Sequence, residues 1–199
     1  VSIALTLVVS IPLGVLSAVR KDGWCDSLAG GLSFLGNAMP NFFVAILLIY
    51  LLAVKLKWFP AVSVGTSPSV VLPAVTLAIA MSAKYTRQIR GVVLAELRKG
   101  YVMGARARGV SEGTILCKSV IPMASPAIVT LLAISIGSLL SGTAVVETIF
   151  LWDGVGKLAV DAIMQRDYPI IQAYGVWMAG IYILVNGAGD AVSRLLGKR

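Results

Sequence analysis

Five long apolar runs constrain this chain more than any other feature of its sequence. They cover residues 1–19, 32–54, 70–90, 125–146 and 170–192. Because a helix needs about 20 mostly apolar residues to cross a bilayer, we expect five membrane-spanning helices. Only 13% of the residues are charged, roughly half the share found in soluble domains, so a soluble globular fold is excluded. The predicted fold is an all-α integral membrane protein, a polytopic helix bundle that forms one domain over residues 1–199.

Lysine and arginine are unevenly distributed among the segments between these runs. Thirteen of the 17 basic residues lie in segments 20–31 and 84–124 and in the tail after residue 192, and the other four lie in segments 55–69 and 147–169. Cytoplasmic loops carry an excess of lysine and arginine, which predicts a cytoplasmic C-terminus and an outer position for Val1. Since Val1 lies inside an apolar run, we expect a further span to precede it. No charge is expected in the middle of a span.

The residue types present exclude several kinds of chemistry. The chain has no histidine, and its two cysteines, Cys25 and Cys117, are far apart, so neither a histidine nor a four-thiolate metal site is expected. No ATP-binding GxxxxGK[ST] motif and no pair of carboxylates at catalytic spacing occur. The basic residues are not interleaved with aromatic ones, as binding of single-stranded nucleic acid would require. We therefore expect no enzymatic activity, no cofactor or metal bound by this chain, and no nucleic-acid partner.

One predicted cytoplasmic loop, residues 84–124, is unusually long and is not of low complexity. Residues 85–98 have a helical apolar period, and residues 101–108 form a second short helix that Gly109 would end. Ser111 is the expected N-cap of a third helical segment. Small residues let the backbone of a partner approach closely, and the arginines of the second helix can donate to its carboxylates and carbonyls. The residues alone leave open whether the loop docks on a protein or lies on anionic lipid headgroups.

Motifs along the chain are similar to those of a known family. In the long loop they are Ala105, Arg106, Ala107, Arg108, Gly109, Ser111, Glu112 and Pro122. Elsewhere they fall, in the same order as in the family, at residues 11–15, 33–43, 145–150, 153–156 and 166–172. The chain resembles the permease subunits of ABC importers, in their peptide/nickel branch, as a fragment that lacks the first transmembrane span. It departs from the family in lacking the glutamate of the loop motif and in residues 196–199.

The resemblance implies a type I ABC importer transmembrane domain of which five of six spans are present. Such a permease forms half of a translocation pore in the bacterial cytoplasmic (inner) membrane, in contact with lipid. Its expected partners are a homologous sister permease, two ABC ATPase subunits that carry ATP and Mg²⁺, and an extracytoplasmic substrate-binding protein. The loop motif would be the coupling element that seats on one ATPase. Closure of the ATPases on ATP would then switch the opening of the pore from one side to the other.

Polar and thioether side chains in or next to the predicted spans are candidates for the pore lining. They are Asn37, Met39, Asn41, Met81, Ser82, Ser138 and Ser141. Intramembrane polar groups usually avoid lipid. Small polar residues also serve helix packing, and methionines also fill cores, so both interpretations stay open.

The external segment 147–169 is expected to be amphipathic and not to cross the membrane. Its candidate residues are Glu147, Asp153, Gly154, Gly156 and Asp167. They would receive the substrate-binding protein or line the mouth of the pore. An ordinary acidic cap on the bundle is the alternative.

The resemblance constrains the solute less than it constrains the fold. Segments 34–41, 78–85 and 161–169 are most similar to nickel-type members of the branch, which favours nickel. Because the chain has no histidine, it would pass nickel as a chelate or offer only weak oxygen and thioether contacts, the latter from Met39, Met81 and Met178. Import of di- or oligopeptides is the alternative within the family. A channel or secondary transporter that works without an ATPase is the alternative from another class, against which the lack of a clear internal repeat argues.

Overall fold

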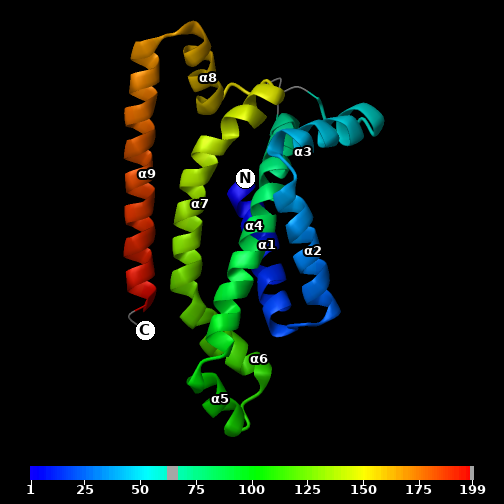
Figure 1. Ribbon diagram of the computed structural model, residues 1–199, viewed down its shortest axis with the longest axis vertical. Coiled ribbons are helices and arrows are strands. Elements are labelled where there is room, and N and C mark those ends of the chain that lie inside the picture. The colour runs from blue at the N-terminus through cyan, green and yellow to red at the C-terminus, as the bar shows by residue number, and fades with distance from the viewer. Residues whose placement is uncertain (62–66, 198–199) are drawn as a thin grey trace.

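The computed structural model describes residues 1–61 and 67–197, with the side chains of these residues except 67, 68, 138 and 140–142. Over this part of the chain the structure is all helical and has no β-strand (Figure 1). The elements are α1 (Ser2–Val19), α2 (Trp24–Ala38), α3 (Asn41–Leu48), the π-helical η1 (Ile49–Lys55), the 3₁₀ turn η2 (Ser67–Val70), α4 (Val71–Leu97), α5 (Gly100–Ala107), α6 (Glu112–Ile115), the π-helical η3 (Leu116–Val120), α7 (Ile121–Ile149), α8 (Val155–Gln165) and α9 (Tyr168–Gly197). The predicted all-α class is confirmed.

Helix α4 is the central element of the bundle. It packs against α1, α2, α3 and α7, and α9 lies against the other side of α7 (Figure 1). A Cβ atom at Gly14 of α1 would lie 2.9 Å from Cβ of Ile89 in α4, so glycine lets these two helices lie this close. Small residues at helix contacts are a usual means of packing inside membranes.

Buried apolar side chains gather near the two ends of α4. At one end, Ile89 belongs to a cluster that also contains Val102 and Ile115 of the loop after α4. At the other end, a smaller cluster joins α3, α4 and α7, and its buried members are Ala45, Leu72, Val146 and Phe150. The middle of α4, within residues 77–85, lines a cavity.

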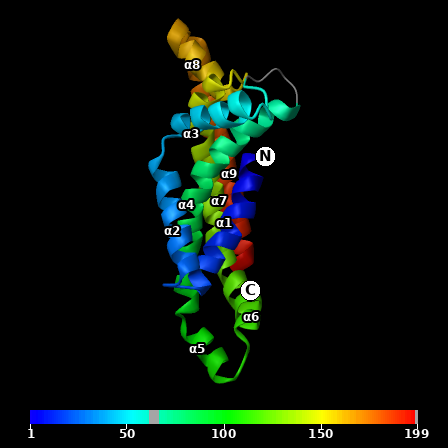
Figure 2. The same ribbon diagram turned by 90° about the vertical axis from the view of Figure 1, so that its right-hand side faces the viewer.

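The prediction of the second span as one continuous helix is wrong. The chain forms α2 and then α3 with η1, and the two halves are bent by 99°. The bend falls at Pro40, which has no amide proton to continue a helix and which favours an extended conformation of the residue before it. Met39 accordingly has φ −81° and ψ 127°. Helix α2 therefore begins inside the predicted first loop, and α3 turns across one end of the bundle (Figure 2).

Helix α4 continues beyond the predicted end of the third span. It runs to Leu97, so Lys84, Arg87 and Arg90, which the sequence analysis assigned to the loop, lie on the helix. The helix that contains the third predicted span therefore carries these three charges. The helical period of residues 85–98 simply continues that of the span, because no proline separates the two.

Fewer helices than the predicted five are apolar enough to cross a membrane on their own. Among the described residues three helical runs meet this requirement of length and hydropathy, namely Ser2–Val19, Glu112–Gly137 and Tyr168–Gly197. The bent pair of α2 with α3 and η1 makes a fourth if it is taken as one span. Helix α4 is the remaining predicted span, and the basic residues of its second half lower its hydropathy. Its neighbours separate it from lipid on several sides, so it needs less apolar surface than the peripheral α9.

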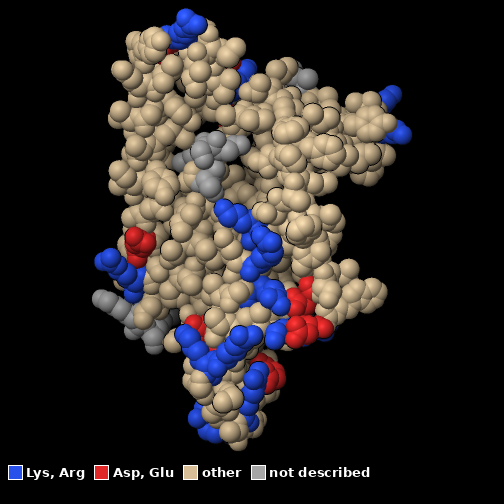
Figure 3. Space-filling model, viewed as in Figure 1, with Lys and Arg blue, Asp and Glu red and all other residues tan. Residues whose placement is uncertain are grey.

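The loops are sorted to the two ends of the bundle in the way that the charge pattern predicts. The turn at residues 20–23, α5, α6 and the last turn of α9 lie at one end, and η1 and α8 lie at the other (Figures 1 and 2). On the face shown in Figure 3, lysine and arginine gather mainly around α5 and the adjoining part of the bundle. We call these two ends the α5 end and the α8 end.

Candidate functional site

The loop between α4 and α7 folds into two short helices at the α5 end. Most residues of the loop motif are exposed there, namely Arg106, Ala107, Arg108, Gly109, Ser111, Glu112 and Pro122. Ala105 is the exception, because it is only 8% exposed and packs in the core of this end. Met103, which the motif does not include, is 66% exposed. We call the exposed side chains of Met103 and residues 106–112 the α5 surface.

Helix α5 ends in a hydrogen-bonded cap centred on Gly109. The amide of Gly109 donates to the Arg106 carbonyl at 2.9 Å, and the amide of Val110 donates to the Ala105 carbonyl at 3.2 Å. This pair of bonds is the Schellman arrangement, which needs a left-handed residue after the helix, and Gly109 has φ 77°. A Cβ atom at this position would have no neighbour within 4 Å. Within this subunit, backbone conformation rather than space therefore selects glycine, and the predicted end of the helix is confirmed.

Arg106 and Glu112 form a two-point ion pair across the turn between α5 and α6. Nε of Arg106 lies 2.6 Å from Oε1 of Glu112, and Nη2 lies 3.0 Å from Oε2. Through these bonds the carboxylate raises the pKa of Arg106, and the guanidinium lowers the pKa of Glu112 below its usual range. Both side chains are exposed, so the pair fixes the shape of the turn more than it adds stability. Ser111 begins α6 as predicted, but its hydroxyl contacts that of Thr114 at 2.9 Å and makes no capping bond to the helix.

Buried side chains fasten this loop to the bundle. Val102 and Ile115 are at most 1% exposed, and they belong to one apolar cluster with Val93 of α4 and Val120. The two helices of the loop therefore share a core with α4 and α7. These contacts hold the α5 surface against the bundle.

Glu96, in the last turn of α4, anchors the start of α5 through polar contacts. Its carboxylate accepts a bond from Lys99 Nζ at 2.5 Å and one from the Tyr101 hydroxyl at 3.1 Å. Burial, together with the carboxylate of Glu96, raises the pKa of Tyr101 to about 12. The phenol is therefore protonated at neutral pH and donates to Glu96.

A charged cluster joins three helices at the α5 end. Asp26 of α2 accepts two bonds from Arg90 of α4, both at 2.6 Å, and one from the Ser17 hydroxyl of α1 at 2.5 Å. The amide of Asp22 donates to the same carboxylate at 3.0 Å. The Asp26 side chain is only 10% exposed, so its charge depends on these donors. Sequence reasoning missed the cluster because Asp26 and Arg90 are 64 residues apart and each was assigned to a loop.

At the α8 end, Glu147 organises the corner between α7 and α8. Its Oε2 accepts a bond from the amide of Lys157 at 2.8 Å, in the first turn of α8, where free N–H groups attract carboxylates. A Cβ atom at Gly154 would collide with this carboxylate, and one at Gly156 would lie 2.8 Å from Cα of Ala144. These three residues of the predicted external set therefore hold α8 against α7.

The two aspartates of the external set make local contacts. Asp153 is highly exposed and lies 2.7 Å from Lys157 Nζ, whose pKa it raises. Asp167 accepts a bond from the amide of Ile170 at 3.2 Å and so caps the start of α9. Both contacts stabilise helix termini, and neither by itself requires a binding partner.

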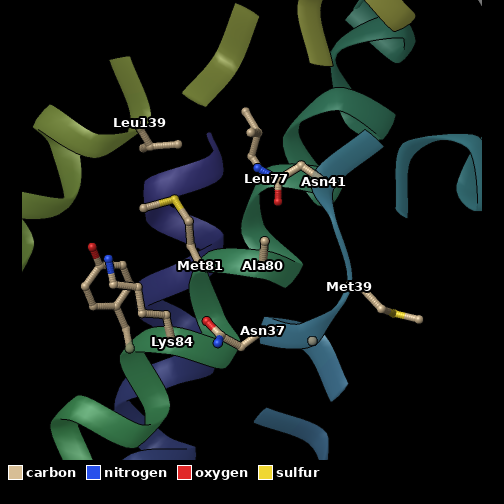
Figure 4. Close-up of a pocket in the computed structure, with 10 residues that line it drawn as sticks. Asn37, Met39, Asn41, Leu77, Ala80, Met81, Lys84 and Leu139 are labelled. Carbon is tan, nitrogen blue, oxygen red and sulfur yellow. The ribbon is translucent and has the colours of Figure 1, made fainter. Parts of the chain in front are cut away.

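A cavity of about 210 Å³ lies between the bend at Pro40, α4 and α7 (Figure 4). Its walls bring together four predicted pore-lining residues, Asn37, Met39, Asn41 and Met81. Lys84 and Tyr85 of α4 also line it. In Figure 4 the Met39 side chain extends away from the other labelled residues, whereas Met81 projects from α4 among them. The 99° bend creates this space, because it turns α3 away from the line of α2.

The other predicted pore-lining residues are not seen in this cavity. Ser82 is 8% exposed and lines a mainly apolar groove between α1, α2 and α4. The side chains of Ser138 and Ser141 lie outside the described residues. Only part of the predicted set therefore shares one cavity.

Comparison with known proteins identifies the family. Residues 10–199 match the family described as the binding-protein-dependent transport system inner membrane component. The chain belongs to this family. As a member of the binding-protein-dependent transport family it is an inner-membrane component with the apolar helices described above, and the resemblance found in its motifs is confirmed.

Curated relatives within this family are named as permease proteins. The oligopeptide transport system permease protein AppB of Bacillus subtilis is 38% identical (100% of this chain, 66% of that protein). The glutathione transport system permease protein GsiC of Pectobacterium atrosepticum is 35% identical (93% and 60%), and the metal-staphylopine import system permease protein CntB of Staphylococcus aureus is 32% identical (100% and 64%). The chain thus spans roughly 60–66% of the length of these relatives. Their names denote transport components and not enzymes, in line with the prediction.

The fold is similar to that of a solved ABC transporter. A chain of the MetNI methionine ABC transporter in an inward-facing conformation superposes with a TM-score of 0.81 over 98% of this chain and 89% of that chain, at 20% identity. A second crystal form of the same transporter gives a TM-score of 0.76. The predicted membrane helix bundle of an ABC importer is confirmed as a fold.

Two residues of the cavity, Lys84 and Tyr85, were absent from the predicted pore-lining set. A usable signal existed, because residues 85–98 were recognised as helix-compatible. A helix that continued from residue 70 through residue 98 would have placed Lys84 at its middle and Tyr85 one position later.

Proposed function

We propose that this chain is the membrane-spanning permease subunit of an ATP-driven importer and forms half of its translocation pathway. Its family supports this, as do relatives that are named as transport system permease proteins. The observation that carries the proposal is the α5 surface, which is capped at Gly109, fastened by Val102 and Ile115, and exposed at one end of the bundle. A held, protruding helix of this kind is suited to transmit movement from a partner to the bundle.

On this proposal, the α5 surface seats on an ABC ATPase subunit that binds ATP and Mg²⁺. A homologous sister permease and a second ATPase complete the assembly. An extracytoplasmic substrate-binding protein delivers the solute at the α8 end. The exposed apolar side chains of α8, such as Met164, offer this protein a surface.

The chemistry of the α5 surface favours a protein partner over lipid headgroups. Anionic lipid is bound by clusters of free basic side chains, and of the two arginines of the α5 surface Arg106 is already paired with Glu112, which leaves Arg108. The surface also exposes the apolar Met103 and the open backbone at Gly109. A protein groove can cover both by close contact, whereas a headgroup layer cannot.

The α5 end and the C-terminus face the cytoplasm in this proposal, and the α8 end faces the outside of a bacterial cytoplasmic membrane. The concentration of lysine and arginine around α5 supports this orientation. ATP binding draws the α5 helices of the two permeases together, and each bundle pivots as a rigid body. The apolar clusters at both ends of α4 support rigid-body movement, which opens the cavity to one side and then to the other.

The proposed solute is nickel carried as a chelate, and small peptides are the second candidate. The nickel-type sequence at residues 34–41 supports the first, and the printed name of the AppB relative favours the second. A bare nickel ion does not fit, because the chain has no histidine and the described residues hold no group of three or more cysteine, aspartate or glutamate side chains placed to bind a metal. The positive charge of Lys84 at the cavity would also repel a free cation.

Met103→Asp tests the permease proposal in the full-length protein expressed with its partner subunits. The change places a carboxylate at an apolar position that the proposal buries against an ATPase. Since a buried unpaired charge is costly, we expect the co-purified ATPase to fall by more than about tenfold. Met164→Asp is the matched control, because it makes the same change at a side chain that is 79% exposed at the opposite end. Full ATPase retention in Met103→Asp would contradict docking at α5.

Uptake measurements test the solute. Cells that carry or lack the full-length gene are given radiolabelled nickel alone, radiolabelled nickel with citrate, or a radiolabelled dipeptide. We expect deletion of the gene to abolish uptake of the chelate. Loss of dipeptide uptake alone would replace nickel by the second candidate, and unchanged uptake of all three would overturn both solutes.

A further inference from the structure

Lys84 places a positive charge at the wall of the central cavity. It is the middle residue of the 27 in α4, a helix that packs against α1, α2, α3 and α7, and its own side chain is exposed in this subunit. Figure 4 shows its side chain on the same stretch of α4 as Met81, which lines the cavity with it. Charged side chains inside a membrane are rare and usually serve a functional contact.

This charge has no counter-ion in the described part of the chain. The five ion pairs recorded there involve other lysines and arginines. The ammonium of Lys84 instead lies 5.7 Å from the centre of the Tyr85 ring. By contrast Arg90, two turns further along α4, is paired with Asp26. Of the three basic residues at positions 84, 87 and 90 of α4, only Arg90 has a recorded ion pair among the described residues, and of the other two only Lys84 lines the cavity.

Uncharged polar groups in the same walls complement Lys84. The hydroxyl of Tyr85 is buried and has no hydrogen-bond partner among the described residues. Asn37 and Asn41, on either side of the bend, add amide groups that can donate and accept. The Tyr85 hydroxyl is covered in this conformation, so a ligand with acceptor oxygens meets Lys84 and the two amides first and reaches the hydroxyl only after a local movement of the ring.

We propose that Lys84, with Tyr85 and the two asparagines, binds a carboxylate of the solute during its passage. The inference rests on the proposed permease function and adds the chemical class that the cavity recognises. A carboxylate offers a negative charge to Lys84 and acceptor oxygens to the hydroxyl and amide donors. It occurs both at the C-terminus of a peptide and in metal chelates built from organic acids, so one site serves either solute. A free metal cation is repelled.

The test uses the full-length permease with its sister permease and ATPases, purified without the substrate-binding protein. Ligand-observed NMR compares a dipeptide with its C-terminal amide. In the wild type we expect the free acid to bind about tenfold more tightly, as expected for one charge-assisted hydrogen bond. Lys84→Met should abolish this preference, and Lys84→Arg should retain it because arginine keeps the charge. Loss of an unpaired charge does not threaten the fold of Lys84→Met.

Arg87→Met is the matched control, because it removes a charge one turn along α4 from a side chain that does not line the cavity. It should leave the acid preference unchanged. Equal binding of acid and amide by the wild type, or an unchanged preference in Lys84→Met, would overturn the inference.

The uptake rate in proteoliposomes separates this inference from the proposed function. With the binding protein saturated with solute, we expect Lys84→Met to slow uptake about tenfold. The assay is run once with the dipeptide and once with nickel–citrate, and the solute whose uptake slows is the one that supplies the carboxylate. Normal uptake by Lys84→Met would overturn the inference alone. Lack of ATP-dependent uptake of either solute by the wild type would overturn the proposed function and the inference with it.

Discussion

The polar side chains of the α5 end and those of the cavity differ in whether they have hydrogen-bond or ion-pair partners within the chain. At the α5 end, Asp26, Glu96 and Glu112 each accept two or more bonds from neighbouring side chains. In the cavity, Lys84 has no counter-ion and the Tyr85 hydroxyl has no partner among the described residues. In the first region the polar side chains are hydrogen-bonded within the chain, whereas in the second some of them have no recorded partner.

This difference matches what each region is proposed to do. A docking surface transmits force only if it keeps its shape when the partner moves, so its polar groups are best satisfied internally. A transport cavity must exchange partners at every cycle, so internal bonds would compete with the solute. The predictions below test whether the two regions respond differently to the same kinds of change.

Asp26→Asn should have the largest effect on stability. It removes the charge that Arg90 and Ser17 contact and leaves the guanidinium of Arg90 uncompensated, at a cost of about 2–3 kcal/mol. The measurement is the thermal midpoint of the detergent-purified complex by size-exclusion chromatography. Asp22→Asn is the control, because the Asp22 side chain is 78% exposed and asparagine tolerates its φ of 63°. Equal midpoints for the two variants would mean that the cluster does not hold the helices together.

Gly109→Val should have the next largest effect, and it acts only through the backbone conformation at this position. A side chain with a branched Cβ in the left-handed region costs about 1–2 kcal/mol, which loosens the α5 cap and lowers the amount of co-purified ATPase. Gly109→Asn should recover most of the ATPase, since asparagine adopts this conformation more readily. If asparagine fails as badly as valine, the partner itself must approach the bare backbone at this position.

A paired substitution compares the two regions directly. Tyr101→Phe at the α5 end removes a bond to Glu96 and should cost about 1 kcal/mol, whereas Tyr85→Phe in the cavity removes an unpaired hydroxyl and should change stability by less than about 0.5 kcal/mol. The thermal midpoint of each purified variant measures this difference. A larger loss in Tyr85→Phe than in Tyr101→Phe would show that the cavity hydroxyl has an internal partner after all.

The sequence predicted the α5 end well because local rules determine it. The glycine that ends α5, the start of α6 at Ser111 and the exposure of the arginines all depend on residues within a few positions of one another. Ala105 was placed on the docking surface although it is buried, since a motif does not tell which face of a short helix packs on the bundle.

The cavity was only partly predictable because it depends on long-range geometry. The helix break at Pro40 could have been predicted from the proline itself. A hydropathy average does not detect a single proline, so it treats α2 and α3 as one span. The pairing of Asp26 with Arg90, 64 residues away, left no local signal. Once α4 was cut short at its first basic residues, Lys84 became a loop residue and its place in the cavity was lost.

The smallest predicted effect is that of pH on the turn between α5 and α6. Arg106 lowers the pKa of Glu112 from its usual value of 4.5. The stabilising contribution of the pair is therefore fully present above that value, and it is lost as the pH falls through the lower value of the folded protein. Between pH 6 and 8 we expect no change in the protection of the amides of residues 105–112 from hydrogen exchange, after correction for the intrinsic rate.

As the pH falls below the usual carboxyl value these amides should lose protection, and Glu112→Gln should show the same reduced protection already at pH 6. The cavity provides the contrast, because no aspartate or glutamate is among the residues described as lining it, so the amides there should not respond over this range. Protection in Glu112→Gln that equals the wild type at pH 6 would mean that the Schellman cap at Gly109 holds the turn alone. The α5 surface would then owe its shape to backbone hydrogen bonds, and the ion pair would be free to exchange with a charged group of the ATPase.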